Sequence, residues 1–289
     1  MSALLLAAAI ASGPAIGTDV MYSSDAEDTE ILKAGVDFDL RYSGPDKHWG
    51  VRVEKARFTP LGQRSRTMDR AYIRAADSIG AWKWSATAGT DGHTILGSAN
   101  IHDESRFRKE FFIEREILET PQGLDRGIYY TFAGAALDLP ADDRNVVTIV
   151  AGVQPFTGDN VRTHLRATYV HVAKANWGLT AQLRTRWFRS SDPGEFDYYS
   201  PRWYAEVLPV VQVRRFVGGW QFLGAVGYGA QRDSASKWRS SRYFNARVTS
   251  PRFRRDWALT AGILWTNTPV STGFTYRYTQ FNIGLTKAL

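Results

Sequence analysis

The sequence predicts an all-β fold: a transmembrane antiparallel up-and-down β-barrel of about 14 to 16 strands, with 16 favoured. Three observations support this prediction. Strand-length segments alternate apolar and polar residues, and aromatic residues make up 13% of the chain. Beyond the N-terminus, no uncharged apolar run approaches the ~20 residues that a spanning helix needs. Successive strand residues face opposite sides, so alternation lets a barrel be apolar outside and polar inside.

The composition is compatible with a single large β domain of 289 residues. The hydrophobic content is 44% with a mean hydropathy of -0.31, as expected when apolar residues alternate with polar ones. The chain has no cysteine, which excludes disulfides and thiolate metal sites. The net charge is 36 - 29 = +7 and suits an anionic partner. Nucleic acid is not expected as that partner, because no zinc-ligand spacing, helix-turn-helix pattern or basic helix is visible.

The N-terminal region divides into two segments before the first expected strand. Residues 1–17, MSALLLAAAIASGPAIG, resemble a secretory signal peptide that ends in a small-x-small cleavage site, although no basic residue precedes the apolar run. A disordered or short helical tail is the alternative. Residues 18–30 are expected to form an acidic, polar, solvated leader. The barrel is therefore predicted over residues 31–289.

Candidate strands, bounded by turn residues, follow one another through this region. The segment 108–118 alternates poorly and is compatible with a short helix, but we predict a strand there. The candidates number about fifteen, and single-chain bacterial barrels have even strand numbers. Outside the central stretch they cover residues 36–42, 49–54, 68–77, 81–90, 94–101, 108–118, 127–139, 201–216, 219–232, 242–250, 256–267 and 272–289.

The central stretch, residues 146–188, contains three strands joined by turns at residues 157–160 and 174–176. In the second and third strands, one face is apolar with an aromatic residue at each end, as expected for belts at two membrane interfaces. The other face is polar and largely cationic, and we predict that it lines the barrel interior. Its members are Arg162, His164, Arg166, Gln182, Arg184 and Arg186.

Two roles remain open for this inward set. Adjacent arginines in a narrow lumen would attract carboxylate or sulfate groups on a passing polymer. Alternatively, they would form a structural ladder with inward acidic residues, for which Asp37, Asp39 and Glu54 are candidates. Further aromatic and basic residues, in the segment 198–204, would either stack on sugar rings or form an interface belt. Those assigned to polymer binding are Tyr199, Arg202 and Tyr204.

Catalysis and metal binding find little support in the sequence. None of the five histidines has a metal-ligand spacing, so neither a metal nor a cofactor is expected. His171 falls on the lipid-facing side of its strand, where an outer-membrane lipase would need a nearby serine, and no serine lies within two residues. The basic run Arg252 to Asp256 is a solvated turn or a contact for lipopolysaccharide phosphates.

The final strand alternates in the manner of outer-membrane barrels. Phe281, Ile283 and Leu285 share one face with Leu289, like the strand that outer-membrane assembly machinery recognises. Lys287 departs from this pattern because it stands on the apolar face. A lysine this close to the strand end can snorkel to the membrane interface.

Three local patterns carry a family resemblance. They are the segment 150–166 (VAGVQPFTGDNVRTHLR), the aromatic-Ser-Pro-basic-aromatic entry at residues 198–204 (YYSPRWY), and the terminal strand. They resemble the C-terminal barrel of the exopolysaccharide-export porins for cellulose and poly-N-acetylglucosamine, and the short YaiO-like relatives of those barrels. The resemblance implies localisation in the bacterial outer membrane. Exporting members usually carry a tetratricopeptide scaffold before the barrel, which this sequence does not show. The resemblance therefore implies either that a separate periplasmic scaffold protein supplies it or that the barrel has a smaller role.

The function expected from the sequence is a passive conduit for polysaccharide export with an arginine-lined lumen. The expected partners are an anionic or neutral polysaccharide, outer-membrane lipid and lipopolysaccharide. The main alternative is a plugged, non-transporting barrel that serves as a surface receptor or assembly partner. The second alternative is an outer-membrane hydrolase acting on lipids or glycans, although the sequence does not favour an enzyme.

Overall fold

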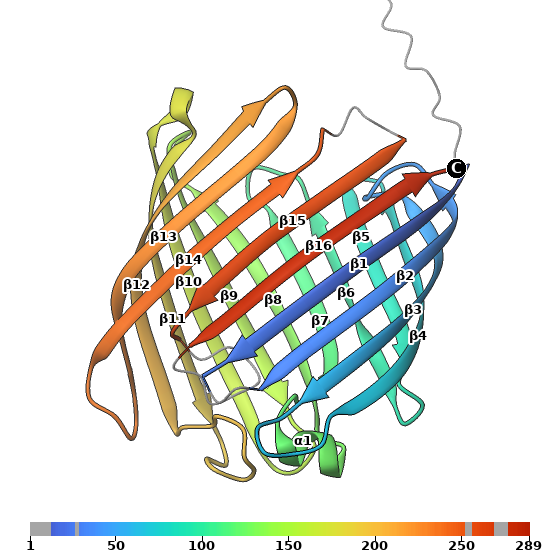
Figure 1. Cartoon of the computed structure of the whole chain (residues 1–289). Coiled ribbons are helices and arrows are strands. Elements are labelled where there is room, and N and C mark those ends of the chain that lie inside the picture. Colours follow the sequence, from blue (N-terminus) through green and yellow to red (C-terminus); the bar gives the residue numbers. More distant parts are fainter. Residues whose placement is uncertain (1–12, 27–28, 252–255, 269–276) are drawn as a thin grey trace, which may run out of the picture.

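The computed structural model describes residues 13–26, 29–251, 256–268 and 277–289, and forms one closed antiparallel barrel (Figure 1). Within these residues there are 16 strands, as the sequence favoured, with one short α-helix, α1, Pro121–Arg126. The strands are β1 Gly13–Asp25, β2 Glu30–Tyr42, β3 His48–Thr59, β4 Arg66–Ile79, β5 Trp82–Thr90, β6 Ile95–Asp103, β7 Lys109–Ile117, β8 Tyr129–Pro140, β9 Asn145–Pro155, β10 Val161–Lys174, β11 Leu179–Ser190, β12 Trp203–Val217, β13 Trp220–Asp233, β14 Arg239–Thr249, β15 Trp257–Thr266 and β16 Tyr278–Ala288.

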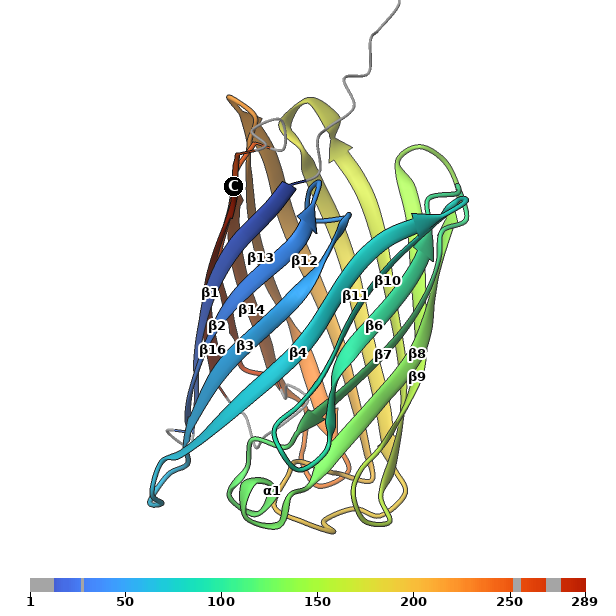
Figure 2. The same cartoon turned by 90° about the vertical axis from the view of Figure 1, so that its right-hand side faces the viewer.

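Each strand pairs with its neighbours in the chain, which makes the barrel up-and-down (Figure 2). The barrel closes where β1 pairs with β16, from Ala15 opposite Ala288 to Asp25 opposite Tyr278. A closed sheet leaves no unpaired edge, which is the condition for strands to cross a bilayer.

The exterior of the barrel is apolar. Outward-facing side chains such as Val226, Ile283 and Leu183 keep 56%, 51% and 42% of their surface exposed, which water would penalise and lipid would not. Separately, no helix in the described part of the chain is long and apolar enough to span a membrane. The closed sheet and its apolar exterior are those of a barrel that crosses the membrane with its strands, as predicted.

A charge on this face has a measurable cost. Leu183 lies in the middle of β11 and faces outward, so the substitution Leu183→Arg is expected to destabilise the inserted barrel by about 2–4 kcal/mol. The free energy of unfolding in urea, measured in lipid vesicles, checks this. Gln182→Arg is the control: it adds the same charge one residue away on the lumen face, and we expect little change.

The connections at the two ends of the barrel differ in length. At the end that holds Gly13 and Leu289, turns are as short as two residues, at 80–81 and 218–219. At the opposite end the connections include residues 118–128, which contain α1, and residues 191–202. Short turns are periplasmic and long loops extracellular in barrels of this kind. Gly13 and Leu289 thus lie at the periplasmic end of an outer-membrane barrel, and α1 lies at its extracellular end.

The predicted N-terminal boundaries are wrong in one respect. The barrel begins at Gly13, because residues 13–25 form β1, and the segment expected to be a solvated leader is part of the wall. Asp19 and Ser23 face inward, where Asp19 meets Arg52 of β3. A cleavage after Gly17 would fall inside β1. Residues 1–12, the rest of the predicted signal peptide, lie outside the described residues.

The ambiguous segment 108–118 forms the strand β7, which confirms the strand prediction over the helical alternative. Phe111 and Ile113 face outward with 50% and 46% of their surface exposed, while Phe112 and Glu116 turn inward. The alternation of apolar and polar residues is weak in this segment because glutamate and arginine side chains occur on both faces of the strand.

Candidate functional site

The strands β10 and β11 form a wall of inward-facing arginines. Arg166 lies directly opposite Arg186, and Thr168 lies opposite Arg184. Like charges that face each other across a strand pair repel. Glu206 of β12, opposite Arg186, reduces this repulsion with a carboxylate oxygen 3.6 Å from Arg186 Nε.

Two cations of this wall are not neutralised. Arg184 Nε donates a hydrogen bond of 2.9 Å to Gln182, and its guanidinium lies 4.8 Å from the ring centre of Tyr243. Arg166 is exposed, with its guanidinium 5.9 Å from the ring centre of Phe132. Among the described residues, no carboxylate lies within ion-pair distance of either arginine. Both therefore present a charged, planar donor that can bind a carboxylate, sulfate or phosphate group.

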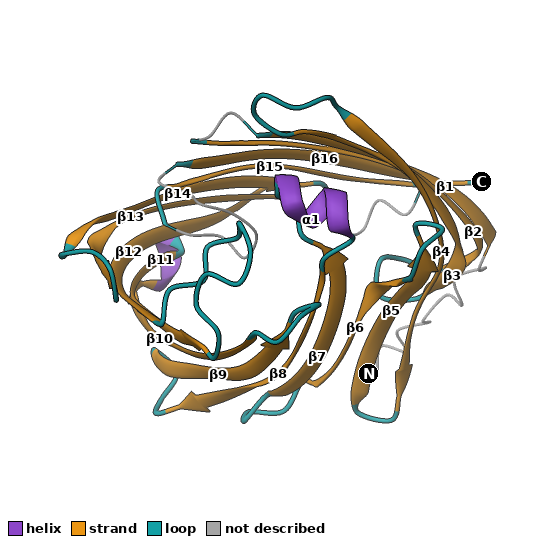
Figure 3. Ribbon diagram, turned by 90° about the horizontal axis from the view of Figure 1, so that it is seen from below, coloured by secondary structure: helices purple, strands orange, loops and turns teal. Residues whose placement is uncertain are grey.

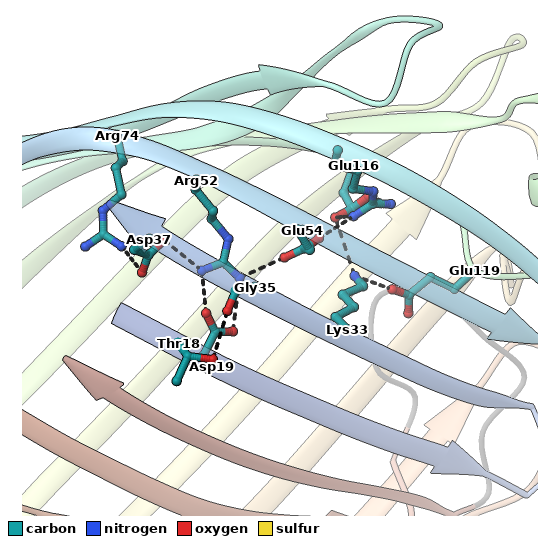
Figure 4. A network of polar contacts seen from close by, with 11 residues as sticks. Thr18, Asp19, Lys33, Gly35, Asp37, Arg52, Glu54, Arg74, Glu116 and Glu119 are labelled. Atoms are coloured by element: carbon teal, nitrogen blue, oxygen red, sulfur yellow. Dashed lines mark hydrogen bonds and ion pairs between the residues drawn. The ribbon is translucent and has the colours of Figure 1, made fainter. Parts of the chain in front are cut away.

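The opposite side of the lumen carries an ion-pair network formed by β1 to β4, β7 and residue Glu119 (Figure 4). Arg52 donates to Asp37 and Glu54 over 3.2 and 2.9 Å and also contacts Asp19. Arg70, whose side chain is fully buried, bridges Glu54 and Glu116 over 3.2 and 2.9 Å. The remaining pairs join Lys33 to Glu116 and Glu119, and Arg74 to Asp37 and Asp39.

This network corrects one prediction. Asp37, Asp39 and Glu54 do face inward, but they pair with arginines of β3 and β4 and not with the arginines of β10 and β11. The lumen therefore has one neutralised wall and one wall with net positive charge. A cavity of about 550 Å³ lies against the neutralised wall.

The extracellular mouth carries a lid, which we define as residues 118–128 and 191–202 (Figure 3). Two carboxylates hold it. Asp197 accepts hydrogen bonds of 2.7 Å from the Thr120 hydroxyl and the Gln122 backbone N–H. Glu195 accepts from the backbone N–H groups of Asp159 and Asn160, in the β9–β10 turn.

An apolar and aromatic cluster fills the space beneath the lid. Tyr198 stacks on Phe156 with ring centres 4.4 Å apart. Leu118, Ile128 and Tyr130, which are almost fully buried, complete the cluster. The Asp197 bonds thus join the two lid segments to each other, and the Glu195 bonds and the aromatic cluster join the lid to the barrel.

Arg162 belongs to this lid contact and not to an accessible lumen wall, contrary to the predicted lining role. It is 2% exposed, and it donates a hydrogen bond to the backbone oxygen of Tyr199. Its guanidinium lies 5.1 Å from the ring centre of Phe156 and 4.7 Å from that of Phe188. A cation enclosed by ring faces is stabilised without a carboxylate.

The other residues predicted to bind the polymer also divide into buried residues and residues that are accessible on the lid or the lumen wall. Tyr204 is fully buried, and His164 is 8% exposed and hydrogen-bonded to Gln154 over 2.9 Å. Tyr199 donates to Asp233 over 2.5 Å; burial, and then this bond, raise the pKa of Tyr199, so that the phenol stays protonated. Arg202 is exposed on the lid. Of the predicted set, Arg166, Gln182, Arg184 and Arg186 remain on the lumen wall.

The lid contacts predict a local effect of one substitution. Asp197→Ala removes both hydrogen bonds to residues 120–122 and is expected to raise the hydrogen-exchange rate of the backbone amides in residues 118–128 by about tenfold. Asp192→Ala is the control, because Asp192 is an exposed residue of the same lid whose recorded contact is through its backbone N–H. Equal protection in both variants would contradict the assignment.

A second hollow, of about 660 Å³, lies at the periplasmic end of the arginine wall. Gln182, Gln212 and Arg214 line it together with Thr180. Arg214 was not singled out from the sequence, although the alternation of residues 203–217 places it inward with Gln212. The polar wall thus continues from Arg166 to the periplasmic end.

His171, the residue considered for a lipase, contacts the first residue of β9. His171 Nδ1 lies 2.9 Å from Asn145 Oδ1, which also accepts a hydrogen bond from the Tyr169 hydroxyl. No serine is among the recorded partners of His171. No group of three or more histidine, aspartate and glutamate residues could hold a metal ion in the described ranges.

The fold and the polar lumen define the class of this protein as a closed 16-stranded antiparallel outer-membrane barrel. A bacterial polysaccharide outer membrane secretin superposes with a TM-score of 0.72 at 10% identity, covering 97% of this chain and 100% of that chain. Pseudomonas aeruginosa OprD gives a TM-score of 0.46 at 10% identity (96% and 95% covered), and Acinetobacter baumannii OccAB3 gives 0.45 at 10% identity (97% and 100% covered). No protein-family model matches the sequence, and the comparison with curated proteins finds no significant match.

Proposed function

We propose that this barrel is a passive conduit for the export of a polysaccharide across the outer membrane. The observation that carries the proposal is the wall of β10 to β12, where Arg166 and Arg184 face the lumen without a carboxylate partner in the described residues. An un-neutralised charge facing a pore is costly unless it meets water or a ligand. The name of the polysaccharide secretin that shares this fold supports the same reading.

The wall would act by offering many weak, exchangeable contacts. Gln182, Gln212 and the arginines donate hydrogen bonds that water or a sugar hydroxyl accepts equally well. A polymer moves along such a surface because each contact it breaks is replaced at the next position. Conduction requires binding that is weak enough to be left again.

We further propose that the chain is a YaiO-like barrel and that a separate periplasmic protein supplies the scaffold for export. The support is the three sequence patterns, of which the segment 198–204 forms the end of the lid and the start of β12. The hollow at the periplasmic end, lined by Gln212 and Arg214, is where a polymer would enter.

The test is the conductance of the refolded protein in a planar bilayer under a salt gradient. We expect steady anion-selective current, and brief blockades when an acidic polysaccharide is added on the periplasmic side. A neutral polysaccharide of the same length is the matched control, which separates charge recognition from simple obstruction. A silent bilayer that contains inserted protein would contradict the conduit.

The second candidate is a plugged, non-transporting barrel that acts as a receptor or assembly partner. The lid favours it, because Tyr198, Phe156 and Leu118 pack at the extracellular mouth. The same recording distinguishes the two candidates. A plugged barrel would stay silent in the wild type and would conduct once Asp197→Ala loosens the lid.

A hydrolase remains the least supported reading. Removing the imidazole in His171→Ala would abolish lipid or glycan hydrolysis in such an enzyme while the barrel stays folded. The contacts of His171 with Asn145 are those of a structural group at the periplasmic rim.

A further inference from the structure

Three exposed arginines stand on the outer surface of the barrel at its extracellular rim, away from the lumen. Arg189, Arg232 and Arg242 are the members of this patch, here called the rim arginines, on β11, β13 and β14. Their neighbours in the chain point inward and are buried: Phe188 is 3% exposed, Gln231 0% and Ser241 0%. Alternation therefore turns the rim arginines outward.

The rim arginines surround one tryptophan. Trp203, at the extracellular end of β12, lies directly opposite Arg189. The guanidinium of Arg232 lies 5.7 Å from the ring centre of Trp203. Neighbouring strands are ~4.8 Å apart, so that the patch from β11 to β14 is roughly 15 Å wide. This is the size of a lipid headgroup and not of an extended protein interface.

The membrane level of the patch follows from the residues beside it. Outward residues nearer the membrane centre on the same strands are apolar or aromatic, among them Trp187, Val207 and Tyr228, with 40%, 42% and 67% of their surface exposed. Tryptophan and tyrosine collect at the headgroup level of a bilayer. The rim arginines therefore lie among the headgroups of the outer leaflet.

The charge of the patch is not balanced by the protein. In the described residues, the outward faces of β11 to β14 carry no aspartate or glutamate. On the outward face of β3, by contrast, Lys55 does have a partner, with its ammonium nitrogen 3.1 Å from a carboxylate oxygen of Asp69. Cations without partners in a headgroup layer indicate an anionic group that comes from the membrane.

We propose that the rim arginines and Trp203 form a binding site for the phosphate groups of a phosphorylated glycolipid in the outer leaflet. Guanidinium groups bind phosphate through two parallel N–H donors, and the indole ring covers the adjoining sugar or acyl region. This site is independent of the lumen and of the proposed conduit. The other candidate contact for lipopolysaccharide, the basic run Arg252 to Asp256, lies outside the described residues except for Asp256.

The test uses the full chain refolded in uncharged detergent, with purified bisphosphorylated lipid A as the probe. Binding is followed by the fluorescence of the tryptophans and by native mass spectrometry. The triple variant R189Q/R232Q/R242Q is expected to bind about a hundredfold more weakly, since each cation near an anionic headgroup contributes about fivefold. K55Q/R57Q/R64Q is the matched control. It removes three charges from β3 and the β3–β4 connection, and its affinity is expected to stay within about twofold of the wild type.

The second readout is the binding of the wild-type protein to lipid A from which both phosphates have been removed. Loss of binding with this lipid supports the site. Equal affinity for it, or unchanged affinity in the triple Gln variant, would overturn the proposal, as would equally tight binding of phosphatidylglycerol. Folding is checked by heat-modifiable mobility in gels. If the Gln variant does not fold, the triple variant R189K/R232K/R242K replaces it. This variant keeps the three positive charges but loses the paired N–H donors of the guanidinium groups, so we expect it to bind lipid A several-fold more weakly than the wild type. Unchanged binding would contradict the site.

Discussion

Reversing the two un-neutralised charges of the lumen, in the double variant Arg166→Glu and Arg184→Glu, is expected to convert an anion-selective pore into a cation-selective one. The substitution changes the lumen charge by four units on one wall, where no recorded carboxylate pairs with either arginine. Lining charges set the sign of the mobile ions that accumulate in a pore. We expect the anion-to-cation permeability ratio to fall by about tenfold or more.

The measurement is the reversal potential in a planar bilayer of zwitterionic lipid under a tenfold salt gradient. Arg189→Glu with Arg232→Glu is the matched control, because it makes the same change in charge on the outward face of the barrel. A shift of similar size in both double variants would show that the arginines act through the overall charge of the protein. An unchanged reversal potential in the lumen variant would remove Arg166 and Arg184 from the conduction path.

The largest effect on stability is expected from Arg70→Ala. The Arg70 side chain has no exposed surface and bonds to Glu54 and to both carboxylate oxygens of Glu116. Removing one partner from a buried ion pair leaves the other charge without compensation and costs about 3–5 kcal/mol. Urea unfolding in lipid vesicles, followed by tryptophan fluorescence, measures the loss.

Lys55→Ala is the control for this experiment. The Lys55–Asp69 pair has a similar distance, 3.1 Å, but 66% and 79% of the two side chains are exposed. An exposed pair contributes about 0–1 kcal/mol because water and salt screen it. If Arg70→Ala cost no more than Lys55→Ala, the network would be incidental to the fold.

The barrel can be predicted from the sequence because apolar and polar residues alternate with a period of two within each single strand. In β10, the apolar residues Val161 and Leu165 alternate with Arg162 and Arg166, and the structure turns the first pair outward and the second inward. The same rule fails at β1. There, the sequence of Asp19 and Ser23 predicts a solvated leader, because the arginine that donates to the Asp19 carboxylate lies on another strand.

The details of the site depend on contacts that a single strand does not contain. Arg162 and Arg166 occupy equivalent positions in the alternation, yet only Arg162 is covered, because the lid reaches it from residues 198–200. Likewise, Gly35 looks like an ordinary strand residue. A methyl group there would lie 2.2 Å from Arg52 Nη2, so glycine leaves the space that the Arg52 guanidinium occupies (Figure 4).

The ion-pair network has a consequence for the order in which the barrel assembles. All of its members, from Asp19 to Glu119, belong to the first seven strands and the residues directly after them. The barrel closes between Asp25 and Tyr278, near opposite ends of the chain, and bringing such distant segments together is slow. The buried charges of the N-terminal half can therefore find their partners early, while the remaining strands are still unpaired. The network is then complete without the pairing of β1 with β16, so a late closing step leaves none of its charges uncompensated.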